Sequence, residues 1–170
     1  MAGGLLRIGV KVVPMEMRPL LWMAVLPAFL LSCSSTPAPS PAPEKAAAPK
    51  PADESRRLPK TNLVESHVVD RELLGKSFMP GGTLGHYQQG KTEYDMFVAK
   101  MPTAQDAAFL LLDWQKALTN SKLVPSFGGY FGDDGGKPVF VFSKGFYIAG
   151  VVGLPEKEAD LPARALATLL

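Results

Sequence analysis

Cysteine and histidine are the scarcest chemically active residues in this 170-residue sequence, which has one cysteine, Cys33, and two histidines, His67 and His86. One cysteine cannot form an internal disulfide, and it excludes a zinc site built from several cysteines. The chain also lacks an excess of either charge, with 18 Lys and Arg against 16 Asp and Glu. Nucleic-acid binding requires clustered basic side chains, so we expect no nucleic-acid partner.

Sequence patterns that mark catalytic or metal sites are also missing. No G-x-S-x-G turn is present, and Ser77, Ser126 and Ser143 have no histidine nearby in the sequence. The stretch GDDGGK, residues 132–137, lacks the spacing of a phosphate-binding loop and the alternating acidic ligands of a calcium loop. Because Gly and Asp favour tight turns, we interpret it as a hairpin turn and expect no metal or cofactor.

The apolar run that stands out in the sequence lies near the N-terminus. Arg18 precedes apolar residues 20–31, and the small residue Ser32 then precedes Cys33. The run is shorter than the roughly 20 residues of a membrane-spanning helix, and Pro27 disfavours a stable helix there. Positive charge, apolar run and small residue in this order are typical of an export signal. Met17 would give this signal a more compact start than Met1.

Residues 30–33, Leu-Leu-Ser-Cys, resemble the lipobox of bacterial lipoproteins. The resemblance implies that residues 1–32 are a signal peptide cut between Ser32 and Cys33, and that Cys33 then carries acyl chains. Leu31 departs mildly from the family, which more often has a small or β-branched residue there. Two or more acyl chains hold a protein stably on a membrane, whereas one is marginal. The alternative for Cys33 is a buried free thiol in a packed core.

Ser34 follows the lipobox cysteine. By resemblance to lipoproteins that are sorted on this position, the absence of Asp implies the outer membrane, with the protein facing the periplasm. Residues 33–60 then form a tether rich in Pro and Ala, which cannot bury enough apolar surface to offset its ordering entropy. Such a tether extends by about 3.1 Å per residue; a proline-rich recognition segment is the alternative.

Residues 61–170 are predicted to fold as a single domain. The predicted strands, separated by glycine-containing turns or a helix, cover residues 83–89, 92–100, 127–132, 138–143 and 146–154. Helices are expected over residues 103–120, where Thr103 and Asp106 resemble a capping box, and over residues 158–170. Residues 63–74 fit either a strand or a short helix. About five strands and two packed helices predict an α+β fold with a mostly antiparallel sheet.

The predicted strand at residues 138–143 places Val139 and Val141 on one face and Phe140 and Phe142 on the other, which favours a strand covered on both sides. Residues 101–115, MPTAQDAAFLLLDWQ, followed by residues 128–152, GGYFGDDGGKPVFVFSKGFYIAGVV, resemble a family of uncharacterised bacterial secreted and lipoprotein domains. The resemblance covers about residues 74–170. It implies the fold and the location, and it supplies no catalytic residue.

Aromatic residues provide the candidate ligand surface. Core packing is the default role of aromatic side chains in a sheet, but an exposed set would mark a ligand or partner site. The candidate residues are Tyr130, Phe131, Phe140, Phe142 and Tyr147.

We expect a lipid-anchored protein of the cell envelope whose small domain has a binding or structural role and no catalytic activity. Its expected partners are the membrane, through the lipid on Cys33, and another envelope protein. One alternative is a periplasmic or surface hydrolase, which requires His67 or His86 in a deep pocket beside a Ser or Asp. The other is a sugar- or peptide-binding module that uses exposed aromatics of the sheet.

Overall fold

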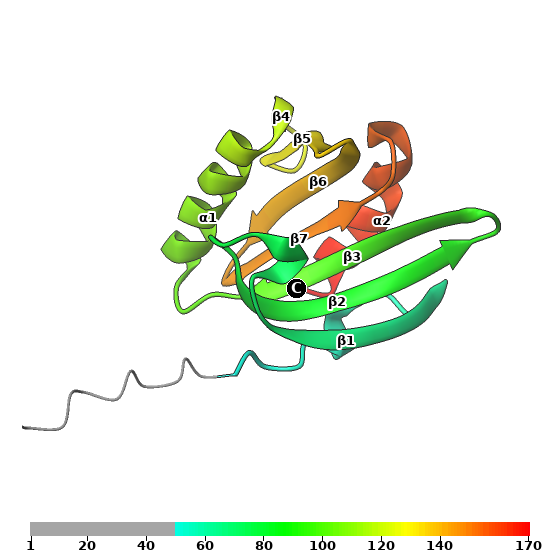
Figure 1. The fold of residues 1–170 in the computed structure, drawn as a ribbon, viewed down its shortest axis with the longest axis horizontal. Helices are drawn as coiled ribbons and strands as arrows, with labels where there is room; N and C mark the ends of the chain where they lie inside the picture. Colours follow the sequence, from blue (N-terminus) through cyan, green and yellow to red (C-terminus); the bar gives the residue numbers. More distant parts are fainter. Residues whose placement is uncertain (1–49) are drawn as a thin grey trace, which may run out of the picture. The chain divides into compact units, whose positions relative to one another are not determined.

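The computed structural model describes residues 50–170. The predicted signal peptide, the lipobox with Ser32 and Cys33, and most of the predicted tether lie outside the described residues. Within residues 50–170 the chain forms a seven-stranded sheet with one helix packed on each face (Figure 1). The predicted α+β fold with a mostly antiparallel sheet and two helices is therefore confirmed, and the predicted number of about five strands is wrong.

All neighbouring strands of the sheet are antiparallel. Their order across the sheet is β1-β2-β3-β7-β6-β5-β4. The strands are β1 (Leu63–Arg71), β2 (Pro80–Gln89), β3 (Thr92–Lys100), β4 (Thr119–Val124), β5 (Gly129–Asp134), β6 (Lys137–Lys144) and β7 (Tyr147–Val152). The helices are α1 (Ala104–Ala117) and α2 (Glu156–Thr168), with short 3-10 turns at Ser55–Arg57 and Leu73–Gly75. No helix in this part of the chain is long and apolar enough to cross a membrane.

Two strands account for the difference between five and seven. Residues 63–74, whose sequence fits either a strand or a short helix, form β1 followed by the short 3-10 turn. β4 begins where the predicted helix was expected to continue, because Leu118 already has extended backbone angles and Asn120 has a φ of 53°. Both strands lie at the sheet edges, where most side chains are exposed. An edge strand of this kind carries little of the apolar alternation that reveals a strand in sequence.

The alternation along β6 is confirmed. Val139 and Val141 are buried in the core that α1 covers, and Phe140 and Phe142 are buried in the core that α2 covers. Each face of the sheet therefore buries its own apolar layer, as expected for a strand that is covered on both sides. The predicted capping box is also present, since Thr103 Oγ1 accepts from the Asp106 backbone N–H at 3.0 Å and Asp106 Oδ2 accepts from the Thr103 N–H at 3.1 Å.

Residues that precede the expected domain, residues 61–170, also pack on the folded part. Leu58 is fully buried in the core on the α2 side, and Glu54 is only 3% exposed. The Glu54 backbone N–H donates to Thr83 Oγ1 of β2 at 2.9 Å. Leu58 is the one large apolar residue of the Pro/Ala-rich stretch, so its burial fixes the end of this stretch on the domain.

Candidate functional site

A hollow of the described surface lies between α2, the β2–β3 hairpin and the segment before β1. We call it the α2 groove; its volume is about 710 Å³. Its floor is formed by Tyr94, Met96 and Leu154, which are 5%, 2% and 4% exposed. Tyr94 and Met96 alternate along β3, so both side chains face α2. The regular pleat of β3 therefore supplies the apolar floor of the groove.

The aromatic part of this floor is held rigidly. The Tyr94 ring stacks on Tyr87 with centroids 5.1 Å apart, and the Tyr87 hydroxyl donates to the Pro59 carbonyl oxygen at 2.9 Å. Burial raises the pKa of both phenols above the ordinary value of about 10. Both phenols stay protonated at neutral pH, which suits hydrogen bonding and packing and disfavours attack on a substrate.

The rim of the α2 groove carries both polar and apolar side chains. Asn62 and Gln89 line the hairpin side, and Lys157 and Glu158 line the start of α2. Leu161 of α2 also lines the groove and is 76% exposed. A leucine so open to solvent beside an apolar floor favours a ligand with an apolar portion, and the amides would hydrogen-bond the polar portion.

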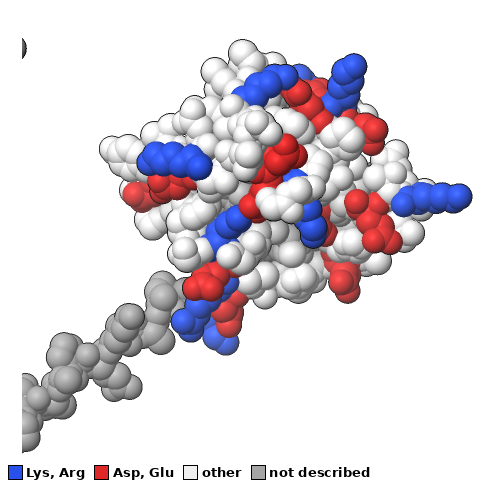
Figure 2. Space-filling view, turned by 45° about the horizontal axis from the view of Figure 1, so that its top comes forward, with Lys and Arg blue, Asp and Glu red and all other residues white. Residues whose placement is uncertain are grey.

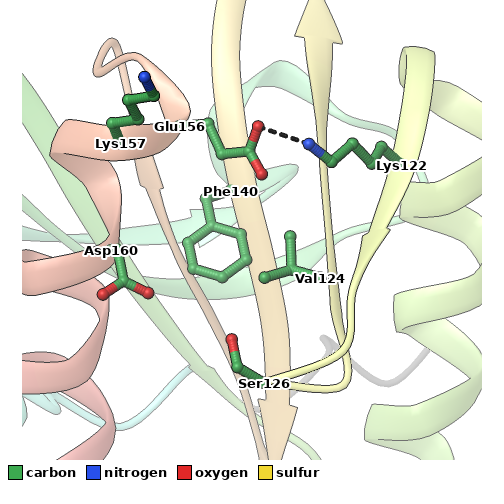
Figure 3. A pocket seen from close by; sticks show the side chains of 7 residues that line it. All are labelled: Lys122, Val124, Ser126, Phe140, Glu156, Lys157 and Asp160. Carbon is green, nitrogen blue, oxygen red and sulfur yellow. Dashed lines mark hydrogen bonds and ion pairs between the residues drawn. The ribbon is translucent and has the colours of Figure 1, made fainter.

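A second hollow of about 390 Å³ lies where β4 and the β4–β5 loop approach α2 (Figure 3). Phe140 and Val124 are its apolar lining, and the ion pair of Lys122 with Glu156 spans one side at 2.8 Å. Ser126 also lines this hollow, as does Asp160 of α2.

Asp160, which lines this hollow from α2, is already paired. Asp160 accepts hydrogen bonds from Arg164 Nε at 2.8 Å and Nη2 at 3.1 Å. These bonds lower the pKa of Asp160, so its carboxylate stays ionised and cannot donate a proton near neutral pH. Arg164 also lies 5.2 Å from the Phe127 ring centroid, at the third hollow of about 470 Å³. These charges stabilise the surface of α2 and bring no acid–base pair together.

The candidate aromatic residues are placed as follows. Phe140, Phe142 and Tyr147 are buried in the core on the α2 side, at 2%, 1% and 7% exposed. Phe131 is half-buried against the same core, whereas Tyr130 is half-buried against the core on the α1 side. The five residues do not share one surface, although Phe140 and Phe142 each reach a hollow. The aromatic residue that lines the α2 groove is Tyr94, which belongs to the predicted strand at residues 92–100 and is not one of the five candidates.

The two histidines lie on neighbouring strands, with His67 exposed on β1 and His86 half-buried on β2. His86 Nδ1 lies 2.9 Å from Asp95 Oδ1, its neighbour across β2 and β3. The hydrogen bond with Asp95 raises the pKa of His86 above its ordinary value, and Glu93 and Glu65 act in the same direction. Neither histidine is among the described residues that line these three hollows. Residues 50–170 contain no group of three or more potential metal ligands.

Charge of one sign does not gather on the surface that Figure 2 shows. Lys and Arg side chains lie beside Asp and Glu side chains over this face of the described residues. Shape and hydrogen bonding would therefore select a ligand on this face more than net charge.

Comparison with models of known protein families, with curated proteins and with solved structures found no match for this chain. The resemblance of residues 74–170 to a lipoprotein domain family stays a prediction, as does the lipobox.

Proposed function

We propose that this chain is a lipid-anchored protein of the bacterial cell envelope whose domain binds an extended segment of another envelope protein in the α2 groove, without catalysing a reaction. The observation that carries the proposal is the α2 groove itself, with its buried apolar floor beside the exposed Leu161. The lipobox at residues 30–33 supports the anchor, and Ser34 supports an outer-membrane location facing the periplasm.

A peptide segment suits the α2 groove better than a sugar. Sugar-binding sites present the open face of an aromatic ring, but the Tyr94 ring is stacked on Tyr87 and is 5% exposed. A peptide needs an apolar pocket for a side chain and hydrogen-bonding groups for its backbone. The floor of the groove supplies the first, and the amides of Asn62 and Gln89 supply the second.

The lipid anchor is tested by metabolic labelling with a fatty acid in a bacterial host. The wild-type chain is expected to take up label and to sediment with membranes, and Cys33→Ala is expected to lose both properties. Ser34→Asp should keep the label and move from the outer-membrane to the inner-membrane fraction. Label retained in Cys33→Ala would contradict the anchor, and an unchanged distribution of Ser34→Asp would contradict the sorting.

The groove is tested by affinity capture from solubilised envelope. Leu161→Asp places a carboxylate at the apolar rim, so we expect loss of the proteins captured by the wild-type chain. Leu123→Asp is the matched control, because Leu123 is also exposed, at 52%, and lies on edge strand β4 outside the groove. Equal capture by both variants would refute binding through the α2 groove while leaving the lipid anchor untouched.

A further inference from the structure

The outer edge of β1 is the longer of the two free edges of the sheet. β1 has nine residues and β4 has six. β1 is the outermost strand and pairs only with β2 among the described residues (Figure 1). A free strand edge presents unpaired backbone N–H and C=O groups to any strand that can lie beside it.

The hydrogen bonds at the end of β1 identify which residues face outward. The Glu72 N–H donates to the Met79 carbonyl oxygen at 3.2 Å, so Arg71 and Pro80 are a non-hydrogen-bonded pair. The register is constant from Arg71 back to Glu65, and backbone direction alternates along a strand. The residues whose N–H and C=O groups point away from β2 are therefore Glu65, His67, Val69 and Arg71.

The opposite edge is less suited to pairing. β4 contains Asn120, with a φ of 53°, and its register with β5 shifts between Thr119 and Lys122. Distortions and lysines on an edge strand hinder the approach of another strand. β1 has its register shift at one end only, between Leu63 and Glu65, which leaves residues 65–71 regular.

We propose that β1 is a self-association surface, on which β1 of a second copy pairs antiparallel about a two-fold axis at Val68. In this register Glu65 lies opposite Arg71 of the second copy, and Arg71 lies opposite its Glu65. Val68, which is 38% exposed, lies against its own counterpart at the axis. The outward-facing residues then form four hydrogen-bonded pairs, with about eight backbone hydrogen bonds between the two sheets.

The charges of β1 select this register over its neighbours. A two-fold axis at His67 would place Glu65 opposite Val69, and an axis at Ser66 would place Glu65 opposite His67. Only the axis at Val68 joins the single Glu and the single Arg of β1 in two symmetrical ion pairs. Opposite charges directly across two strands stabilise the pairing, whereas charges on an edge otherwise discourage it.

Disulfide trapping in the full chain, purified in detergent, tests the proposal. Val68 pairs with itself across a non-hydrogen-bonded position, where Cα atoms lie about 4.5 Å apart, within the range of a disulfide. Under a mild oxidant, most molecules of the Val68→Cys variant are expected to form the crosslinked dimer. In Ser66→Cys the two sulfurs would be about 13 Å apart along the strands, so crosslinking should stay at the wild-type level. The wild-type chain reports any crosslink through Cys33.

Two further variants separate pairing from misfolding. His67→Pro removes an outward N–H that β2 does not use, and proline is tolerated on an edge strand. It should abolish the crosslink of Val68→Cys while thermal unfolding by circular dichroism shows an intact domain. Glu65→Lys and Arg71→Glu should each weaken dimerisation by about tenfold in sedimentation equilibrium, because each places like charges opposite one another. The variant that carries both substitutions should restore dimerisation.

Three results would overturn the proposal. The first is a wild-type chain that sediments as a monomer up to about 100 μM, a concentration at which even weak dimers populate. The second is equal crosslinking of Ser66→Cys and Val68→Cys. The third is a variant with both Glu65→Lys and Arg71→Glu that does not recover the dimerisation lost in each single variant. None of these results depends on the α2 groove or on the lipid anchor.

Discussion

Arg57 joins the segment before β1 to the C-terminal helix, and its removal tests how firmly this segment belongs to the domain. Its Nε donates to Glu54 Oε2 at 2.8 Å, and its Nη1 donates to the Leu169 carbonyl oxygen at 2.8 Å. Its guanidinium carbon lies 4.4 Å from the Tyr147 ring centroid. Because Glu54 is only 3% exposed, Arg57→Ala leaves a buried carboxylate whose remaining cationic neighbour is Arg56, at 3.8 Å.

The expected loss of unfolding free energy follows from these contacts. Breaking a buried pair by removing one partner costs about 3–5 kcal/mol, and a cation–π contact adds about 1 kcal/mol. The Arg57 side chain is 23% exposed, so solvent screens part of the interaction. We therefore expect Arg57→Ala to destabilise the domain by about 3 kcal/mol and to lower its Tm by about 10 °C.

Urea unfolding of the full chain, followed by far-ultraviolet circular dichroism, measures this loss. Arg56→Ala is the matched control, because the Arg56 side chain is 75% exposed and its loss should cost less than about 0.5 kcal/mol. Replacing Glu54 by Gln in the Arg57→Ala background removes the unpaired charge and should recover part of the loss. Equal unfolding midpoints for Arg57→Ala and Arg56→Ala would refute the reasoning.

Two further predictions concern the sheet. A Cβ at Gly150 of β7 would meet the Phe140 carbonyl oxygen and would lie 2.6 Å from the Phe97 ring, so Gly150→Ala should cost about 3 kcal/mol in urea unfolding. Adding Phe97→Leu should recover part of that loss, and a stable single variant would contradict the packing. The pKa of His86 is raised by Asp95, so the stabilisation from this pair is complete below about pH 6.5 and is lost as the pH rises through the raised pKa. Titration of His86 by nuclear magnetic resonance should give a lower pKa in Asp95→Asn than in the wild type, and an unchanged titration midpoint would exclude the pair.

The sequence was most informative where local rules and tertiary packing agree. The alternation of Val139, Phe140, Val141 and Phe142 predicted a strand with two buried faces, and both faces are buried. The Thr103–Asp106 capping box marked the start of α1, because its hydrogen bonds join residues three positions apart. These features depend on neighbours in the sequence, so they can be recognised without knowing the fold.

The sequence was least informative about edges and contacts between distant segments. β4 was missed because an exposed edge strand has no apolar alternation. Most of the aromatic residues predicted to form a ligand surface are buried in the core instead, because the type of a side chain does not reveal which face of the sheet a helix covers. The attachment of Glu54 to Thr83 joins residues 29 positions apart, which no local pattern signals.

The sequence by itself determined the α+β class, the two helices and the alternation along β6, and it predicts a lipobox at residues 30–33. Each of these rests on residue type at short spacing. Only the tertiary structure decided that Tyr94 and Leu161 line the same groove, that Arg57 reaches Leu169, and that β1 is a regular edge strand of the described sheet. These features arise where segments far apart in the chain meet, and the order of strands in the sheet sets which segments those are.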